Sequence, residues 1–219
     1  YLGASGLGLN LKVVEAGEAV EQAGTPGNET FYPMQWAPLS VNAPAAWQNG
    51  CTGKGVRVAI LDGGIHKTHI DLAANLDAAR SASFVPDFTF DQDTGTFWHG
   101  THVAGIVAAA DNNIGIIGIA PEATLIGVKV LHSGSGAFSW IIQGILYAST
   151  PIAGGGAGAD IINMSLGAVF PKADDTGSSG RLIAALNKAV NYAGRYGVLV
   201  VSSAGNDALS QFSASNVGD

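Results

Sequence analysis

The chain has 219 residues, 47% of them apolar, which is enough to bury the core of one large domain or two small ones. A formal net charge of −7 and an isoelectric point near 5.0 argue against nucleic acid as the main partner. No run of about 18 apolar residues occurs, so we expect no membrane span, and the single cysteine, Cys51, excludes an internal disulfide bond.

The first 30 residues are rich in Gly, Ala and Glu and contain few aromatic residues. We interpret residues 1–30 as a leader or extension, such as the remnant of a pro-segment, that stands apart from the main core. Residues 31–47 contain three prolines and more aromatic side chains. They predict an ordered surface segment that ends in a short helix near residues 43–48.

From residue 56 onward, apolar runs alternate with segments of helical periodicity. Strands are predicted at residues 56–61, 84–90, 124–131, 161–164 and 198–203, and helices at residues 99–110, 138–146 and 182–193. The strand segments are almost continuously apolar, as is typical of parallel strands that are covered on both faces. The alternation predicts an α/β fold, a three-layer sandwich with a mostly parallel central sheet flanked by helices.

The predicted helix at residues 99–110 is built almost without large side chains. Its larger apolar residues recur at helical spacing, so we expect them to face the core. They are Val103, Ile106, Val107 and Ala110. Glycine costs a helix about 1 kcal/mol relative to alanine, so Gly100 and Gly105 indicate either tight packing or a nearby ligand.

Polar residues follow three of the predicted strands, namely Asp62, the segment 165–167 and Asn206. Ligands bind beyond the carboxyl ends of parallel strands, and the helix that begins at His99 reaches the same edge. An aspartate can orient an imidazole while the imidazole moves a proton to and from a nucleophile, and an asparagine amide can stabilise an oxyanion. The alternatives are that Asp62 caps the turn before residues 63–64 and that His99 belongs to a core helix.

Four segments resemble, in order and context, those of the subtilisin-like serine proteases (subtilases). They are Asp62-Gly-Gly-Ile65, His99-Gly-Thr-His-Val-Ala-Gly105, Ile162-Asn-Met-Ser-Leu-Gly167 and Ser203-Ala-Gly-Asn206. The resemblance spans residues 35–207 and implies a subtilisin-like fold, with residues 31–219 as the N-terminal part of the catalytic domain. It also implies serine endopeptidase activity, extended polypeptide substrates and a secreted, extracellular protein.

The resemblance implies catalytic roles for three residues. Asp62 would orient the imidazole, His99 would act as general base and acid, and Asn206 would donate to the oxyanion. An extended substrate is expected to bind between two strand-like segments through main-chain hydrogen bonds, and a third segment is expected to form a wall of the main specificity pocket. These segments are, in turn, Gly134, Ser135 and Gly136; Ser165, Leu166 and Gly167; and Ser203, Ala204 and Gly205.

The Gly-Thr-Ser-Met-like segment that carries the family's nucleophile does not occur in the 219 residues. We therefore expect the nucleophilic serine beyond residue 219, with the remaining C-terminal part of the same catalytic domain as a partner. The alternative is a catalytically inactive subtilase-like domain that binds peptides. A nucleotide-binding domain is disfavoured because no Gly-x-Gly-x-x-Gly follows the first strand with an acidic residue about 20 positions later.

The resemblance also implies a structural calcium ion, since the family binds calcium with an aspartate at the position of Asp71 and with the loop that follows the histidine helix. Oxygen ligands suit a hard cation. The expected ligands are the side chains of Asp71 and Asn112 and the carbonyl groups of Ala110, Ile114 and Ile116. The family adds a ligand from the N-terminal segment, but the aligned position near Tyr32 offers no convincing one. The alternative is a polar turn without an ion.

Overall fold

The computed structural model describes residues 29–93, 98–168 and 178–206, so nearly all of the predicted extension lies outside the described residues. A five-stranded sheet in the order β2-β3-β1-β4-β5 forms the centre, and every pairing within it is parallel. The strands are β1 (Arg57–Asp62), β2 (Ala82–Ser83), β3 (Thr124–Lys129), β4 (Ile161–Met164) and β5 (Leu199–Ser202). The predicted parallel sheet is thereby confirmed.

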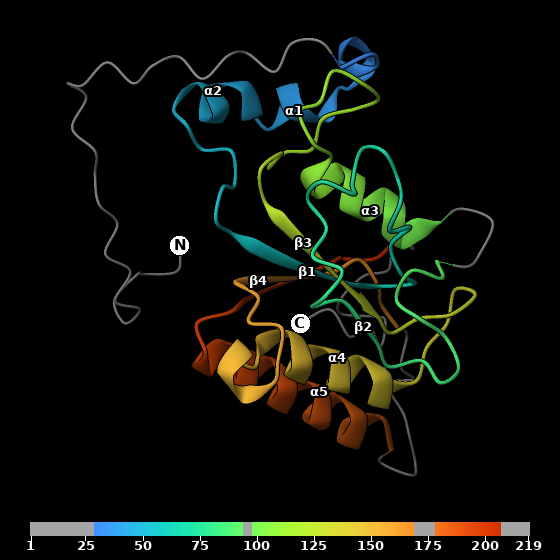
Figure 1. Ribbon diagram of the computed structural model, residues 1–219. Helices are drawn as coiled ribbons and strands as arrows, with labels where there is room; N and C mark the ends of the chain where they lie inside the picture. Colours follow the sequence, from blue (N-terminus) through green and yellow to red (C-terminus); the bar gives the residue numbers. More distant parts are fainter. Residues whose placement is uncertain (1–28, 94–97, 169–177, 207–219) are drawn as a thin grey trace, which may run out of the picture.

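Helices cover both faces of this sheet (Figure 1). Helix α3 (His99–Ala108) packs on one face, while α4 (Phe138–Ser149) and α5 (Ser178–Arg195) pack against each other on the opposite face. The shorter helices are η1 (Tyr32–Met34), α1 (Ala37–Ser40), α2 (Ala43–Gln48) and η2 (Ile152–Gly154). The predicted three-layer sandwich is the observed architecture.

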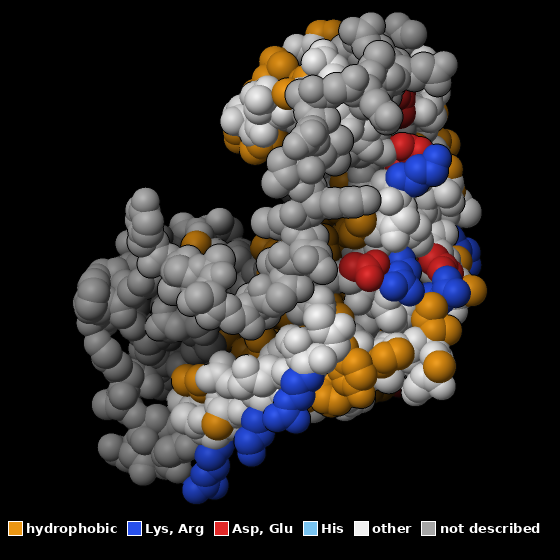
Figure 2. Space-filling model, turned by 90° about the vertical axis from the view of Figure 1, so that its left-hand side faces the viewer, with side chains coloured by type: hydrophobic (Ala, Val, Ile, Leu, Met, Phe, Trp, Pro, Cys, Tyr) orange, Lys and Arg blue, Asp and Glu red, His pale blue; other side chains and the backbone are white. Residues whose placement is uncertain are grey.

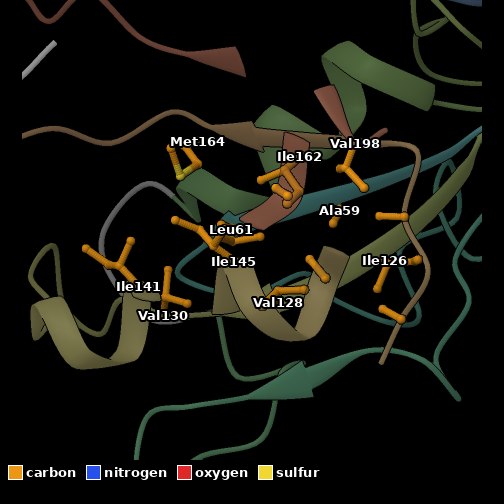
Figure 3. Packing of buried hydrophobic residues seen from close by; sticks show 14 of the residues in the cluster. Ala59, Leu61, Ile126, Val128, Val130, Ile141, Ile145, Ile162, Met164 and Val198 are labelled. Carbon is orange, nitrogen blue, oxygen red and sulfur yellow. The ribbon is translucent and has the colours of Figure 1, made fainter. Parts of the chain in front are cut away.

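Alternation along β1 explains why this strand is apolar throughout. Ala59 and Leu61 belong to the cluster that packs on α4 and α5, whereas Val58 and Ile60 belong to the cluster that packs on α3. Figure 3 shows the first cluster, in which side chains from three strands meet Ile145 of α4. Full burial of one such aliphatic side chain contributes about 1.5–3 kcal/mol, so both faces of β1 stabilise the domain.

The register of the sheet determines which residues reach its functional edge. β1 pairs with β3 from Arg57 opposite Thr124 to Asp62 opposite Lys129, and it pairs with β4 on its other side. Because the strands are parallel, their carboxyl ends lie at one edge. Asp62, Lys129 and the residues after Met164 therefore come together there.

The predicted strand at residues 84–90 is wrong in position. The structure places the short strand β2 at Ala82–Ser83, where it pairs with the end of β3. Pro86 has no N–H to offer a neighbouring strand, and Asp87 has a φ of 65°, a left-handed conformation that an extended strand does not contain. The chain therefore turns away from the sheet after Ser83.

The buried face of α3 also differs from the expectation. The helix buries its small residues, and the expectation that Ile106 faces the core is wrong, because Ile106 is 46% exposed. Val103 and Val107 are only partly buried. The buried residues of α3 are Gly100, Thr101, Ala104, Gly105 and Ala108. Small residues allow this helix to approach the sheet closely, and that approach determines which face is buried.

The N-terminal segment docks on the chain that follows α3. The indole of Trp47 is 2% exposed and its Nε1 donates a hydrogen bond to the carbonyl of Ile119 at 2.9 Å. The amide side chain of Gln35 donates to the carbonyl and accepts from the N–H of Ile117, both at 2.9 Å. The predicted surface segment and its short helix are therefore held in place by specific contacts.

The surface carries charges of both signs. Figure 2 shows basic and acidic side chains beside one another over the middle of one face, and a row of basic side chains along its lower edge. Within the three described ranges, no helix combines the length and apolar character needed to cross a membrane.

Two glycines of α3 provide a matched test of this packing. A Cβ atom at Gly100 would lie 2.2 Å from the carbonyl oxygen of Gly64 and 3.0 Å from Cβ of Asp62, whereas one at Gly105 would meet only Cδ1 of Ile116, at 3.5 Å. We expect Gly105→Ala to raise the free energy of unfolding by up to about 1 kcal/mol. Gly100→Ala should lower it by about 1–3 kcal/mol because backbone must move. Urea unfolding measures both, and equal effects would contradict the close approach.

Candidate active site

A buried carboxylate and a half-exposed imidazole meet at the carboxyl edge of the sheet. Asp62 is the last residue of β1 and is 1% exposed, and His99 is the first residue of α3. Nδ1 of His99 lies 2.9 Å from Oδ2 and 3.0 Å from Oδ1 of Asp62. The structure therefore brings together two residues that are 37 positions apart in the chain, as the sequence predicted.

The carboxylate determines the tautomer of the ring. An ionised carboxylate only accepts hydrogen bonds, so Nδ1 of His99 donates to Asp62, and Nε2 is left with a lone pair. Burial raises the pKa of Asp62, and hydrogen bonds from the Gly63 N–H, at 2.6 Å, and from His99 oppose that rise. This arrangement orients a proton acceptor whose side chain is 51% exposed.

A second carboxylate holds the N-terminal turn of α3. Oδ2 of Asp93 accepts hydrogen bonds from the N–H of Thr101 at 2.9 Å and from its hydroxyl at 2.7 Å. A negative charge at a helix N-terminus is favourable because the first N–H groups have no partners within the helix. Oδ1 of Asp93 is buried and has no hydrogen-bond partner among the described residues. Asp93 thereby helps to position His99.

Trp98, directly before His99, has an unusual backbone. Its φ is 40° and its ψ is 56°, in the left-handed region, although its side chain is large and 65% exposed. A bulky residue with positive φ is an outlier, and such strain, of order 1–3 kcal/mol, concentrates at functional sites. The strain lies beside the imidazole.

The dyad lies at the edge of a cleft of about 510 Å³. The cleft wall contains two predicted substrate-binding segments together with apolar side chains from β4, α4 and α5. The lining residues include Gly134, Ser135, Gly136, Ser165, Leu166, Gly167, Leu131, Phe138, Ile141, Met164 and Leu186. Its size and mixed lining suit an extended chain with apolar side chains.

The predicted strand at residues 134–136 is a tight turn in the structure. His132 and Ser135 exchange backbone hydrogen bonds at 2.7 and 3.1 Å, and Gly134 has a φ of 81°. The main-chain groups of Ser135 are thus occupied within the turn. Pairing with a substrate strand is left to Gly134 and Gly136, which also line the cleft.

The opposite side of the cleft continues from β4. The hydroxyl of Ser203 donates to the carbonyl of Leu166 at 3.1 Å, and the Ser203 N–H donates to the Met164 carbonyl at 3.1 Å. Ser203, Ala204 and Gly205 are exposed, as is Asn206, and none of the four lines the cleft among the described residues. Their predicted roles as pocket wall and oxyanion donor therefore stay predictions.

The predicted cation loop encloses the buried side chain of Asp71. Its Oδ2 accepts the N–H of Ile116 at 3.1 Å, its Oδ1 lies 3.3 Å from Nδ2 of Asn112, and its carbonyl accepts the N–H of Ala110 at 2.9 Å. Oδ1 of Asn112 accepts the N–H of Ile114 at 3.0 Å. The structure thus packs Asp71 against the loop that contains the other four predicted ligand residues.

Glu29 enters the same loop from the N-terminal segment, and sequence reasoning missed it. Its Oε1 accepts the N–H groups of Asn112 and Asn113, each at 2.9 Å, and its Oε2 is buried without a partner among the described residues. Burial and the adjacent Glu29 raise the pKa of Asp111. An orphaned carboxylate oxygen beside further carboxylates fits a hard cation. No cluster of three or more His, Cys, Asp or Glu surrounds a metal position in the described ranges, so loop carbonyl and amide oxygens would complete the shell.

Two further charges near the dyad escaped the sequence analysis. Lys129 stands inside an apolar strand segment, and this interruption was a usable signal because a lysine in a doubly covered strand needs buried partners. Asp93 is one of several acidic residues in a polar loop, and nothing in its local sequence distinguishes it. Both lie close to Gly63, the residue after Asp62.

Several known proteins are related to this chain in sequence. The profile of the subtilase family (Peptidase_S8) matches residues 53–219. Subtilisin BL from Lederbergia lenta is 44% identical over 181 residues, 82% of this chain and 58% of that protein. Subtilisin E from Bacillus subtilis (strain 168) is 44% identical over 179 residues, 81% of this chain and 41% of that protein. The chain spans about half the length of the curated relatives it matches.

A solved structure supports the same relationship. It belongs to the proteases from Pseudoalteromonas arctica PAMC 21717 and is 31% identical in sequence, with a TM-score of 0.68. The match covers 84% of this chain and 60% of that one.

Burial of Asp62 predicts a pH-dependent gain in stability when its charge is removed. A carboxyl group with a raised folded pKa stabilises the fold below its ordinary pKa of about 3.9 and loses that contribution as the pH rises through the raised value. We expect Asp62→Asn to be more stable than the parent at pH 7, by a margin that shrinks toward pH 4. Thermal unfolding across this range measures the difference. A less stable variant at pH 7 would show that the lost hydrogen bonds outweigh the relief of burial.

Proposed function

The chain belongs to the subtilase family, and we propose that the catalytic unit of which it forms part is a serine endopeptidase that hydrolyses peptide bonds. The observation that carries the proposal is the hydrogen bond of 2.9 Å between buried Asp62 and His99 at the edge of the cleft. In this proposal Asp62 orients the ring and His99 moves the proton.

The proton transfer follows from the orientation of the imidazole. Nε2 of His99 accepts the proton of a serine hydroxyl as its oxygen attacks the peptide carbonyl carbon, and Asp62 stabilises the imidazolium that forms. The same proton then passes to the nitrogen of the leaving amine, and water repeats the sequence on the acyl-enzyme. The relatives are longer than this chain, and we propose that a segment outside these 219 residues supplies the serine.

Substrate binding is proposed to use the two walls of the cleft. An extended polypeptide lies between Gly134–Gly136 and Ser165–Gly167 and pairs with their free main-chain groups. Apolar side chains such as Phe138 and Met164 line the space between these walls, so large apolar substrate residues are favoured. The side-chain amide of Asn206 donates to the oxyanion in the tetrahedral intermediate.

The proposal extends to partners and location. Extended polypeptides are the substrates, and the remaining C-terminal part of the catalytic domain is the structural partner. The family resemblance implies that the protein is secreted. Detection of the processed protein in the culture medium of its natural host would support this last point.

Two variants and one reagent test the proposed mechanism in the full-length protein. A serine-directed phosphonylating reagent should abolish peptide hydrolysis, and His99→Ala should lower kcat by about 10⁶-fold because the general base is lost. Asn206→Ala should lower kcat by about 10²- to 10³-fold with a much smaller change in KM, because its hydrogen bond strengthens in the transition state. Steady-state kinetics on a chromogenic peptide measures all three effects.

The possible results separate the two readings of the family. Hydrolysis that survives both the reagent and His99→Ala would contradict the assigned roles. A parent protein that binds peptides but does not cleave them would instead support an inactive peptide-binding domain.

We also propose that calcium binds the loop around Asp71. The proposal rests on the buried carboxylates of Asp71 and Glu29 and on Oε2 of Glu29, which has no hydrogen-bond partner within the part of the chain that the structure describes. Asn112 and the carbonyl groups of Ala110, Ile114 and Ile116 complete the proposed ligand set. Glu29 is the proposed ligand from the N-terminal segment, where the position near Tyr32 had offered no convincing one.

Removal of calcium should destabilise the protein through this loop. A cation that binds only the folded state adds about 2.7 kcal/mol at a hundredfold excess over Kd, so a chelator should lower the Tm. Glu29→Gln and Asp71→Asn should each remove most of the calcium-dependent rise in Tm. Asp87→Asn is the matched control, since Asp87 is an exposed carboxylate outside the loop and asparagine tolerates its positive φ. Equal calcium responses in all four proteins would place the ion elsewhere.

A further inference from the structure

Lys129 is a fully buried cation at the end of β3, directly beside the dyad. Its side chain is 0% exposed, and its register partner in β1 is Asp62. Nζ donates hydrogen bonds to the carbonyl of Gly63 and, at 2.8 Å, to the carbonyl of Leu131. The ring of Phe88 lies 5.9 Å from Nζ. One ammonium thus joins the turn after Asp62 to the start of the segment that lines the cleft.

Two carboxylates, the buried Asp62 and the partly buried Asp93, act on this ammonium without contacting it. In the described part of the chain Lys129 forms no direct ion pair. Burial lowers the pKa of Lys129, and the negative charges of Asp93 and Asp62 oppose that effect. Oδ1 of Asp93 is buried without a hydrogen-bond partner among the described residues, and it lies against Gly63, whose carbonyl Lys129 binds. The two side chains therefore meet at one glycine behind the dyad.

We propose that the buried Lys129 and the partly buried Asp93 form a pair of opposite charges that sets the basicity of His99. They are positioning residues, since neither touches a reacting atom. While both charges are present, their opposite effects on the imidazolium form of His99 cancel. Loss of either member leaves one uncompensated charge in a region of low dielectric constant, where charges act strongly over several ångströms.

The signs of the two losses are opposite. Without the ammonium, the remaining negative charge stabilises the imidazolium form of His99, and activity that needs the neutral ring requires a higher pH. Without the carboxylate of Asp93, the remaining positive charge destabilises the imidazolium, and activity extends to lower pH. A purely structural role for either residue predicts no such reversal.

Other charged and titratable groups face this region and stay unchanged in the Lys129 and Asp93 variants. Asp62 itself lies on β1. The surrounding loops contribute His66, whose backbone N–H donates to the hydroxyl of Thr101, and His132, whose ring centroid lies 3.9 Å from that of Phe88 in a stacked arrangement. Lys67 and Asp91 form an ion pair at 2.6 Å on the neighbouring loops, and α3 carries His102. These groups are the same in the parent and in the Lys129 and Asp93 variants.

The test measures the pH dependence of His99 in the full-length protein by two independent readouts. The first is the midpoint of the NMR titration of the His99 ring in histidine-labelled protein, and the second is the acid limb of kcat/KM. We expect Lys129→Met to raise the midpoint by roughly 0.5–1 pH unit and Asp93→Asn to lower it by a similar amount. The double variant should return close to the parent.

Two controls separate charge from shape. Lys129→Arg keeps the cation and should hold the midpoint near the parent value, even if the larger side chain lowers stability. Lys67→Met makes the same chemical change as Lys129→Met at a lysine whose side chain is 55% exposed. Solvent screens an exposed charge, so its midpoint should move by less than about 0.2 pH unit.

The outcomes decide the proposal in either direction. Opposite shifts in the two single variants, cancelled in the double variant, support it. Shifts of the same sign, or no shift in the NMR titration, would overturn it. The inference rests on the proposed hydrolase function, but the midpoint of the NMR titration can be measured even in a protein that hydrolyses no peptide. A protein with opposite NMR shifts and no hydrolysis would therefore overturn the proposed function alone.

Discussion

The close approach of the first turn of α3 to the end of β1 is the contact on which the whole site depends. Gly100 lies so near the carbonyl of Gly64 and Cβ of Asp62 that no side chain fits between them. Because the helix begins there, the side chain of His99 contacts Asp62 directly. Small residues along the buried face of α3, and two glycines after Asp62, follow from the same constraint. Helix and strand are positioned by packing, and the dyad takes its geometry from them.

Charge complements this packing. Three charged side chains, Asp62 of the dyad and Asp93 and Lys129 behind it, lie close together. Each forms hydrogen bonds with backbone groups and also interacts electrostatically with the other two. A single buried carboxylate is costly and tends to take up a proton. Hydrogen bonds from Gly63 and His99 and the proximity of a cation lower the free-energy cost of an ionised Asp62 at neutral pH. The site is therefore polar within an otherwise apolar core, and its polar groups depend on one another.

Much of the fold could be predicted because its signals are local. The strand at residues 161–164 has the predicted bounds, and the others except β2 differ by at most two residues at an end. The dyad was predictable for the same reason, since its residues stand at the ends of recognisable elements. The role of Glu29 was not predictable, because the N–H groups it binds lie 83 and 84 positions away. Lys129 interrupts an apolar strand, which signals a buried polar partner, but periodicity does not identify that partner as Gly63, 66 positions away. Ile106 was misplaced because close packing, and not side-chain size, selects the buried face of α3.

Because β1 lies at the centre of the sheet, the two parts of the site differ in local stability. β1 is paired on both sides and covered on both faces, so Asp62 belongs to a part of the fold that opens only with global unfolding. The turn at residues 132–136 is closed by two backbone hydrogen bonds and belongs to the segments that fluctuate locally. Warming should therefore weaken peptide binding at temperatures where Asp62 and His99 are still hydrogen-bonded. Amide hydrogen exchange would then be slow in β1 and fast in the turn that faces it across the cleft.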